Sequence, residues 1–412
     1  MTRIGGRFGR VEPRRRARSF LLGLVAGLPR VNCWTIAEHA GDATPDGMQH
    51  LLARAVWDAD AVRDDLRDYV VDHLADPDAV LVIDETGDVK KGTATVGVQR
   101  QYTGTAGRIE NAQVGVYLVY AGAGGHAFID RALYLPASWT DDQGRLTAAG
   151  VPDGVTFATK PTLARRMITR ALDAGAPAGW VTGDEVYGAD PRLRADLHAR
   201  EVGYVLAVPS NTRVTTTAGT ATAADLARRL PRRAWHRRSC GAGAKGGRHY
   251  QWAWLPTPDD AVPGCHWLLI RRNVRDGKLA FYRAFSPRPG TLSTLARVAG
   301  RRWTIEESFQ TGKELAGLDE HQVRHWTSWQ RWTLLAMLAH AFLSVTAAAE
   351  RTRNPTPDGL IALTLNEIRR LFTRLLPNPP PLATHILRWS KWRRRHQAVA
   401  RACHYRRRNQ EL

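Results

Sequence analysis

The stretch Ala79-Val80-Leu81-Val82-Ile83-Asp84 is a short, continuous apolar run that ends in an acid. Such a run predicts a β-strand that is buried on both faces, as in a parallel sheet. Residues 179–183 predict a second buried strand, which ends at Asp184. In open α/β sheets, ligands bind outside the carboxyl ends of the strands. We therefore expect both carboxylates to point into one cleft.

The segments around these two strands follow an informative order. Glycine-rich turns separate the first strands, and Pro161 and Gly175 bracket the first helix as helix-end residues do. In chain order we expect strands at residues 95–102, 113–120 and 127–135, a helix at 161–174, the strand at 179–183, a helix at 191–200 and a strand at 204–208. This order predicts an α/β fold, with an RNase-H-like mixed sheet flanked by helices, a β-rich insertion and an N-terminal helical domain.

Composition and pattern divide the chain into five parts. These are a helical domain at 1–75, the first part of the RNase-H-like core at 76–210, a β-rich insertion domain at 211–290, the second part of the core at 291–350, and a basic helical C-terminal region at 351–412. In the first part, two short helical segments at 35–40 and 46–55 flank a linker with glycine and proline. This pattern suits a helix-turn-helix or an ordinary helical hairpin, and both interpretations stay open.

The charge of the chain points to a polyanionic partner. Its 412 residues carry a formal net charge of +20, spread along the chain, and 43% of them are hydrophobic, which excludes a disordered chain. Nucleic acid fits this charge best. The apolar run Leu334 to Val345 is judged too short to span a bilayer, and no signal peptide is predicted. The four scattered cysteines predict neither a disulfide framework nor a structural zinc site.

A third carboxylate is predicted on a helix at residues 301–313. At 3.6 residues per turn, Arg302, Glu306 and Lys313 fall on one narrow stripe, beside an apolar stripe that can pack on the sheet. Arg302 and Glu306 can also form an ordinary i,i+4 pair on a solvated face, which is the alternative interpretation. A lone Asp after a strand is, similarly, often only a turn former or a helix cap. The combination of the three acids carries the argument.

Together these motifs resemble the DDE transposases of bacterial insertion sequences. The resemblance is closest to the cut-and-paste group that has a β-strand insertion between the second Asp and the Glu, and it spans about residues 75–350. That group has a helix signature of Tyr, two residues, Arg, three residues, Glu, six residues and Lys. Arg302, Glu306 and Lys313 match it, whereas the Tyr position falls on Ala299, with Trp303 as a candidate substitute. Residues 82–87 and 181–188 are similar to the group's first two motifs.

The resemblance implies the roles of the site residues. Asp84, Asp184 and Glu306 would be the catalytic residues and would bind two Mg²⁺ ions, with Mn²⁺ as a substitute. Arg302 and Lys313 would contact phosphates near the transposon end. The implied partners are double-stranded DNA, both element ends and target, and a second protomer in a homodimer on DNA. The implied location is the bacterial cytoplasm, associated with the nucleoid.

Further DNA-binding candidates come from the residues themselves. Lys90 and Lys91 closely follow the first Asp and can meet phosphate. Trp235, Arg237 and Arg238 lie in a basic cluster of the insertion, which suits a phosphate track with a base-stacking platform. The alternative is that the tryptophans of the insertion are core residues. The C-terminal arginines, at 393–395 and 406–408, are either phosphate contacts or a solvated tail.

The sequence thus predicts a DNA transposase that cleaves the ends of an insertion sequence and joins them to target DNA by two-metal-ion phosphoryl transfer. Two alternatives remain: an RNase-H-like nuclease without strand transfer, and a non-catalytic DNA-binding protein derived from a transposase.

Overall fold

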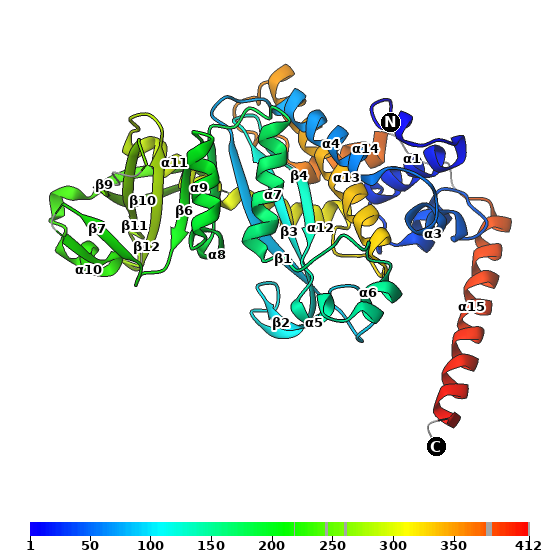
Figure 1. The fold of residues 1–412 in the computed structure, drawn as a ribbon. Coiled ribbons are helices and arrows are strands. Elements are labelled where there is room, and N and C mark those ends of the chain that lie inside the picture. Colours follow the sequence, from blue (N-terminus) through cyan, green and yellow to red (C-terminus); the bar gives the residue numbers. More distant parts are fainter. Residues whose placement is uncertain (218, 244–245, 259–261, 376–380, 411–412) are drawn as a thin grey trace.

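A computed structural model describes residues 1–217, 219–243, 246–258, 262–375 and 381–410 of the chain (Figure 1). The helices are α1 Val11–Val25, α2 Cys33–His39, α3 Asp46–Ala53, α4 Ala59–Leu74, α5 Ala137–Thr140, α6 Gln143–Ala149, α7 Lys160–Asp173, α8 Glu185–Gly188, α9 Pro191–Ala199, α10 Ala223–Arg229, α11 Leu292–Arg301, α12 Trp303–Ala316, α13 Trp326–Arg353, α14 Leu365–Leu375 and α15 Ala383–Gln410. The strands are β1 Val80–Val89, β2 Gln99–Thr103, β3 Arg108–Ala121, β4 His126–Leu133, β5 Trp180–Gly183, β6 Gly203–Val208, β7 Arg213–Thr216, β8 Gly219–Thr222, β9 His236–Gly243, β10 Gly246–Pro256, β11 Cys265–Arg272 and β12 Leu279–Ser286.

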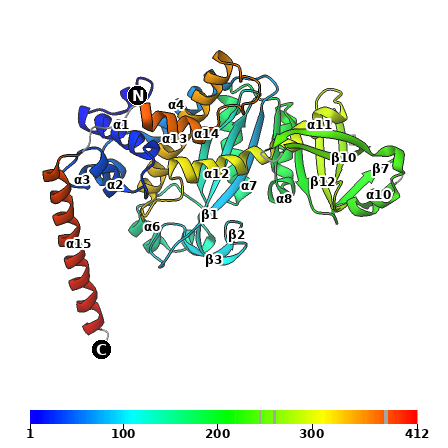
Figure 2. The same cartoon turned by 180° about the vertical axis from the view of Figure 1, so that it is seen from behind.

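The centre of the molecule is a five-stranded mixed sheet in the order β4-β3-β1-β5-β6. The strands β4, β3 and β1 are antiparallel, and β1, β5 and β6 are parallel. Parallel neighbours need crossover connections, which the helices α7 and α9 provide. Helix α7 lies on one face of the sheet and α12 on the other (Figures 1 and 2). The expected RNase-H-like α/β fold is therefore confirmed.

Strand β1 is longer than its apolar run. Residues 80–83 are completely buried and pair with both β3 and β5, as the run predicts. The antiparallel pairing with β3 then continues as far as Val89. Asp84 therefore does not end its strand, which corrects the expectation; it stands where the pairing with β5 stops. The polar continuation is possible because an antiparallel pair tolerates a solvent-facing side.

The segment expected as a strand at residues 95–102 is only partly one. The strand β2 begins at Gln99, and residues 95–98 form a turn. In this turn Val96 and Val98 are buried in a small separate cluster with Trp139, below α5 and α6. Their apolar character thus reflects packing against helices and not a place in the ladder.

The β-rich insertion extends the central sheet. Strand β12 pairs antiparallel with β6, and β11, β10 and β9 follow in order, which makes one sheet of ten strands. The hairpin of β7 and β8, together with α10, closes a second cluster of buried residues around Leu268 and Ile270. The insertion therefore continues the same hydrogen-bonded framework that carries Asp84 and Asp184.

After the insertion, α11 packs across β9 and leads the chain back to the centre. A Cβ on Gly300 would lie 2.6 Å from the Cβ of Cys240, so only glycine allows this close approach. The helix expected at residues 301–313 is in fact two: α11 ends at Arg301 and α12 begins at Trp303, with Arg302 between them. This junction aims α12 across the sheet.

The N-terminal helices α1 to α4 surround the long helix α13, which forms the second half of the core. Within them, α2 starts with a capping box between Asn32 and Thr35, and it packs against α1 and α3. Helix α13 has 28 residues, so it is longer than the run Leu334 to Val345 and its length does not exclude a membrane span. In the described part of the chain it is the one helix long and apolar enough for that, but 78% of its most apolar window is buried inside the protein.

The last helix, α15, starts on the N-terminal helices and projects away from the body of the protein (Figures 1 and 2). The indole N–H of its buried Trp389 donates to the carbonyl oxygen of Asp42 at 2.8 Å, and Arg393 pairs with Glu38 at 2.6 Å. Beyond Arg393 nearly every side chain described is exposed. Residues 376–380 lie outside the described residues.

A glycine of α8 that lies against β6 gives a test of the packing of the sheet. A Cβ on Gly188 would lie 1.9 Å from the carbonyl oxygen of Ala207 in β6. We expect Gly188→Ala to lower the free energy of unfolding by about 1–3 kcal/mol, because α8 must move off the sheet. Urea unfolding measures this, with Gly9→Ala as the control, since nothing lies within 4 Å of a Cβ there. An unfolding curve of Gly188→Ala that overlays the wild type would contradict the packing described.

Candidate active site

Two aspartates lie side by side at the end of the parallel pairing. In the register of β1 and β5, Ile83 is opposite Gly183, so the residues that follow them are Asp84 and Asp184. Asp184 caps the short helix α8, and its Oδ1 accepts a hydrogen bond from the N–H of Val186 at 2.9 Å. Asp184 is thus a helix cap, as the alternative interpretation has it. The same hydrogen bond also fixes its carboxylate next to β1.

The negative charges of the two carboxylates repel each other. Burial raises the pKa of Asp84 to about 7, and the charges of Asp184 and Glu85 contribute to the rise, whereas Arg302 opposes it. Burial also raises the pKa of Asp184, again with a contribution from Glu85. Two like charges out of water favour either protonation or a bound cation. The arrangement therefore has the properties of a cation site.

Arg302 connects the third predicted acid to this pair. Its Nη1 lies 3.5 Å from Oδ2 of Asp84, and its Nη2 donates to Oε1 of Glu306 at 2.9 Å. Glu306 is therefore on the same side of the sheet as Asp84. Within the described residues, no three His, Cys, Asp or Glu side chains stand close enough together to hold a metal ion. In this arrangement the guanidinium occupies the position between the acids.

The other cation of the predicted stripe also faces β1. Lys313 Nζ donates to Oγ1 of Thr86 at 2.8 Å, two residues beyond Asp84 on the same strand. Alternate residues of a strand share a face, so Asp84 and Thr86 both point toward α12. The Arg302–Glu306 pair does form, as the alternative interpretation has it. The stripe nevertheless lies against the sheet and is not merely a solvated surface.

Glu85, which directly follows Asp84 in the sequence, has contacts that the sequence analysis does not predict. It points to the opposite face of the sheet, where Lys160 Nζ donates to its Oε1 at 2.7 Å. The hydroxyl of the buried Tyr187 donates to its other oxygen. Tyr187 stands three residues after Asp184, in the second motif, and this spacing was the available signal. The contacts link β1, α7 and α8 immediately behind the two aspartates.

Glu307, the acid next to Glu306 on α12, has its partners elsewhere and not at the aspartates. Its two carboxylate oxygens lie 3.4 Å from Nε2 of His126 and 3.4 Å from Nη2 of Arg248. The hydrogen bond with His126 is the main reason that the pKa of Glu307 is lowered. Its charge is therefore already compensated elsewhere, which leaves Glu306 as the acid of α12 nearest to Asp84.

The candidate DNA-binding residues that follow Asp84 differ in their exposure to solvent. Lys90 is half-buried, and its Nζ donates to the carbonyl oxygen of His321 at 2.9 Å, so it is held inward. Asp88, on the same face, binds His321 at 2.9 Å and holds that segment against β1. A phosphate contact of Lys90 stays a prediction. Lys91 is exposed.

The three candidates in the insertion lie at the β9 end of the ten-stranded sheet. Trp235 is half-buried, and the guanidinium carbon of Arg272 lies 3.6 Å from its ring centroid, so one face of the ring is covered. Arg237 and Arg238 are exposed on β9, and Arg238 Nε donates to Oγ of Ser293 in α11 at 3.2 Å. These contacts are with the insertion and α11, and they do not join the acidic group.

An RNase-H-like sheet with paired acids at the end of its parallel strands defines the class of nucleic-acid-processing enzymes with a carboxylate site. A family model described as DDE superfamily endonuclease matches residues 5–252. The chain belongs to this superfamily, and the resemblance expected from the motifs is confirmed. The match contains Asp84 and Asp184 and ends before Glu306.

Two known proteins are similar to the chain. A probable transposase for the insertion sequence element IS701, from Microchaete diplosiphon, is 30% identical over 193 residues, which are 46% of this chain and 47% of the relative. The chain thus spans about half the length of the curated relative it matches. A cryo-EM structure of the piggyBac transposase synaptic complex with hairpin DNA is 12% identical, covering 91% of this chain and 75% of that one, with a TM-score of 0.43.

The raised pKa of Asp84 gives a pH test. The folded state binds more protons than the unfolded chain between pH about 4 and 7, so Asp84 lowers the free energy of unfolding as the pH rises through that window. With EDTA present, we expect Asp84→Asn to be more stable than the wild type at pH 8 by roughly 2–4 kcal/mol, and equally stable near pH 4.

Urea unfolding at the two pH values measures this difference. Glu185→Gln is the control, because Glu185 is the exposed neighbour of Asp184, and we expect it to change stability little at either pH. An Asp84→Asn protein whose stability difference from the wild type is the same at pH 4 and pH 8 would show that Asp84 is not in the environment described.

Proposed function

We propose that the chain is a DNA transposase, which cleaves the ends of an insertion sequence and joins them to target DNA. The observation that carries this proposal is the bridge of Arg302 between Asp84 and Glu306, next to Asp184. Membership of the DDE superfamily endonucleases supports the cleavage step. The similarity to a probable insertion-sequence transposase supports the joining step.

We infer that Asp84, Asp184 and Glu306 hold divalent cations, with Mg²⁺ as the natural ion and Mn²⁺ as a substitute. The donor set fits, because Mg²⁺ prefers carboxylate oxygens and retains several waters. The raised pKa values of both aspartates fit as well, because a cation would remove their conflict. Two such ions supply charge stabilisation for the attacking and the leaving oxygen of an in-line phosphoryl displacement.

In this proposal, the guanidinium of Arg302 occupies the cation position between Asp84 and Glu306, and Arg302 exchanges these acids for a DNA phosphate. With cations held by Asp84 and Glu306, the guanidinium of Arg302 would be free to bind a phosphate of the DNA, for which its planar fork is suited. Lys313, on the same stripe, offers a second positive charge near Thr86. The contacts of Glu85 with Lys160 and Tyr187 act as positioning contacts, since they hold β1 against α7 and α8.

The reaction then follows as two displacements at phosphorus. In the first, water attacks the phosphodiester at the element end, the bond to the 3′ oxygen breaks, and the element is left with a free 3′ hydroxyl. In the second, that hydroxyl attacks a phosphodiester of the target, a new P–O bond forms, and a target 3′ oxygen leaves with a proton. The same acids serve both steps, and no covalent enzyme intermediate is required.

The exposed half of α15 is proposed as part of the DNA-binding surface. It carries arginines that project into solvent, and they are not used in contacts with the body of the protein as Arg393 is. A helix that is polar all round and projects from the body has no core to cover. A homodimer on DNA would bring two such helices to the paired element ends.

The acidic residues are tested by incubating the protein with element-end DNA, a target plasmid and Mg²⁺ or Mn²⁺. We expect Asp84→Asn, Asp184→Asn and Glu306→Gln each to reduce cleavage at least about a hundredfold, the scale of several kcal/mol of lost charge stabilisation. Binding of the DNA, measured by fluorescence anisotropy, should persist. Glu307→Gln is the matched control on α12, and it should retain cleavage.

The products separate the candidate functions. Joined element and target DNA supports the transposase. Cleavage without joining would replace it by the nuclease alternative, and binding without either reaction would leave only a DNA-binding protein. Undiminished cleavage by Asp84→Asn would remove Asp84 from the site.

The role of α15 is tested by the salt dependence of DNA binding. Each phosphate contact adds about −0.9 to the slope of log K against log salt concentration. We expect Arg394→Gln with Arg395→Gln to weaken binding of any duplex and to reduce the magnitude of this slope by about 1–2. The control is Arg374→Gln, at an exposed arginine of α14. An unchanged slope for the double variant would show that α15 is a solvated tail.

A further inference from the structure

A cavity of about 500 Å³ opens at the edge of the sheet beside β4, and it contains none of the residues of the acidic site. Its walls are α4, α7, the first turns of α13 and the loop of residues 152–158. The charged residues that line it are mostly positive. They are the arginines Arg63, Arg131, Arg166, Arg170 and Arg331 and the aspartates Asp58 and Asp60.

Arg131 is the most enclosed of these arginines. Arg131 is only 4% exposed, and its Nη2 donates to the carbonyl oxygen of Gln330 at 2.9 Å. Its Nε has no hydrogen-bond partner, and no carboxylate of the described chain forms an ion pair with its guanidinium. Burial lowers the pKa of Arg131 to about 10. Asp130 and Asp60 are near enough to oppose this shift, but neither forms an ion pair with the guanidinium, which is thus held out of water without a directly bound anion.

Arg331, on the cavity wall formed by α13, is a second buried arginine without an ion pair to any described residue. It is 7% exposed, and its Nη atoms donate only to main-chain carbonyl oxygens, those of Leu51, Leu52 and Trp57, at 3.2 to 3.4 Å. Its Nε is also without a partner in the described part of the chain. Burial lowers its pKa to about 10 as well. Two buried guanidinium groups therefore line one cavity and lack counter-ions.

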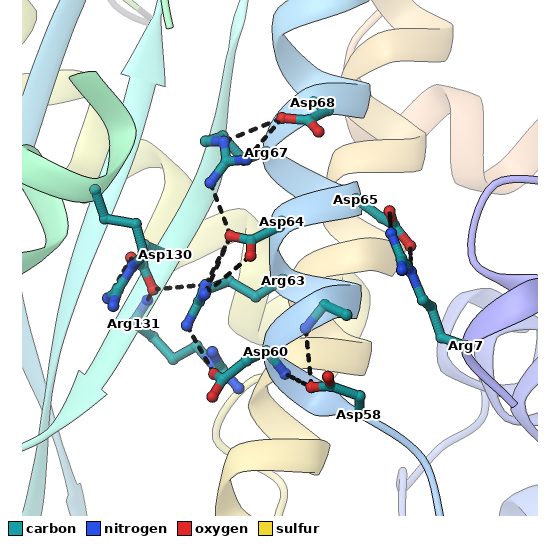
Figure 3. A network of polar contacts seen from close by, with 12 residues as sticks. Arg7, Asp58, Asp60, Arg63, Asp64, Asp65, Arg67, Asp68, Asp130 and Arg131 are labelled. Atoms are coloured by element: carbon teal, nitrogen blue, oxygen red, sulfur yellow. Dashed lines mark hydrogen bonds and ion pairs between the residues drawn. The ribbon is translucent and has the colours of Figure 1, made fainter. Parts of the chain in front are cut away.

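The aspartates near Arg131 make their direct ion pairs with other arginines, as Figure 3 shows for Asp60 and Arg63. Asp130 accepts from Arg170 at 2.8 Å and lies 4.0 Å from Arg63. Asp60 pairs with Arg63 at 2.7 Å. Asp58 caps α4, accepting from the N–H groups of Asp60 and Ala61. Arg63 and Arg170 thus have direct carboxylate partners, whereas Arg131 and Arg331 have none among the described residues.

Leaving a charged group buried and unpaired costs several kcal/mol, so these two arginines require a reason. We propose that the cavity binds a phosphate-bearing anion, whose oxygens accept from Arg131 and Arg331, with Arg166 at the exposed rim. Guanidinium groups bind phosphate through their terminal N–H groups, and Nη1 of Arg131 makes no hydrogen bond within the described chain. The proposal does not depend on the cleavage chemistry proposed above.

The phosphate can come from two sources with the same chemistry. One is a small phosphorylated molecule, which the volume of the cavity accommodates. The other is a phosphate at the end of a DNA strand. The enclosure of Arg131 excludes the continuous backbone of a duplex, which is too broad to reach a residue that is 4% exposed.

The test is calorimetric titration of the full-length protein with sodium pyrophosphate, against sodium chloride at equal ionic strength. We expect pyrophosphate to bind and to raise the melting temperature. Arg131→Met should remain folded, because it removes a buried charge that forms no ion pair, and should weaken binding at least about tenfold, as for a lost charge-assisted hydrogen bond. Arg166→Gln, at an exposed position, should weaken it about threefold.

The control is Arg192→Gln, at an exposed arginine of α9 outside the cavity, which should bind pyrophosphate as the wild type does. Competition then separates the sources: displacement by a 5′-phosphorylated oligonucleotide, but not by its unphosphorylated form, assigns the site to a DNA end, and no displacement by either assigns it to a small molecule. Absence of pyrophosphate binding to the folded wild type would overturn the proposal. Equal binding by the wild type, Arg131→Met and Arg166→Gln would overturn it too.

Discussion

The parallel pairing of β1 with β5 is the constraint on which the site depends. It brings Asp84 and Asp184 together at the point where the ladder ends, in surroundings that disfavour both charges. Arg302 relieves the conflict by reaching Asp84 while it holds Glu306. The local energetics therefore favour any cation that can take this place, and a divalent ion would satisfy the acids better than one guanidinium.

Much of this arrangement could be predicted from residue patterns. A strand buried on both faces requires a continuous apolar run, and residues 80–83 show one, so the start of β1 was predictable. The spacing of Arg302, Glu306 and Lys313 placed them on one stripe, and two of them reach β1. The order of strands and helices then defined the RNase-H-like topology.

Other features depend on contacts between distant segments, which no local pattern encodes. The extension of β1 beyond Asp84 follows from its pairing with β3, and the inward position of Lys90 follows from His321, far along the chain. Glu85 is adjacent to Asp84 in the sequence, but strand alternation turns its side chain to the other face of the sheet, where it binds Lys160. The continuity of the insertion with the central sheet likewise rests on the pairing of β12 with β6.

The most direct test of the account is anomalous diffraction from crystals of the protein soaked in Mn²⁺. We expect manganese density within coordinating distance of carboxylate oxygens from Asp84, Asp184 and Glu306, with the guanidinium of Arg302 moved away from Asp84. Crystals in which manganese is absent from this place, while Arg302 still joins Asp84 to Glu306, would contradict the central claim that these three acids form one cation site.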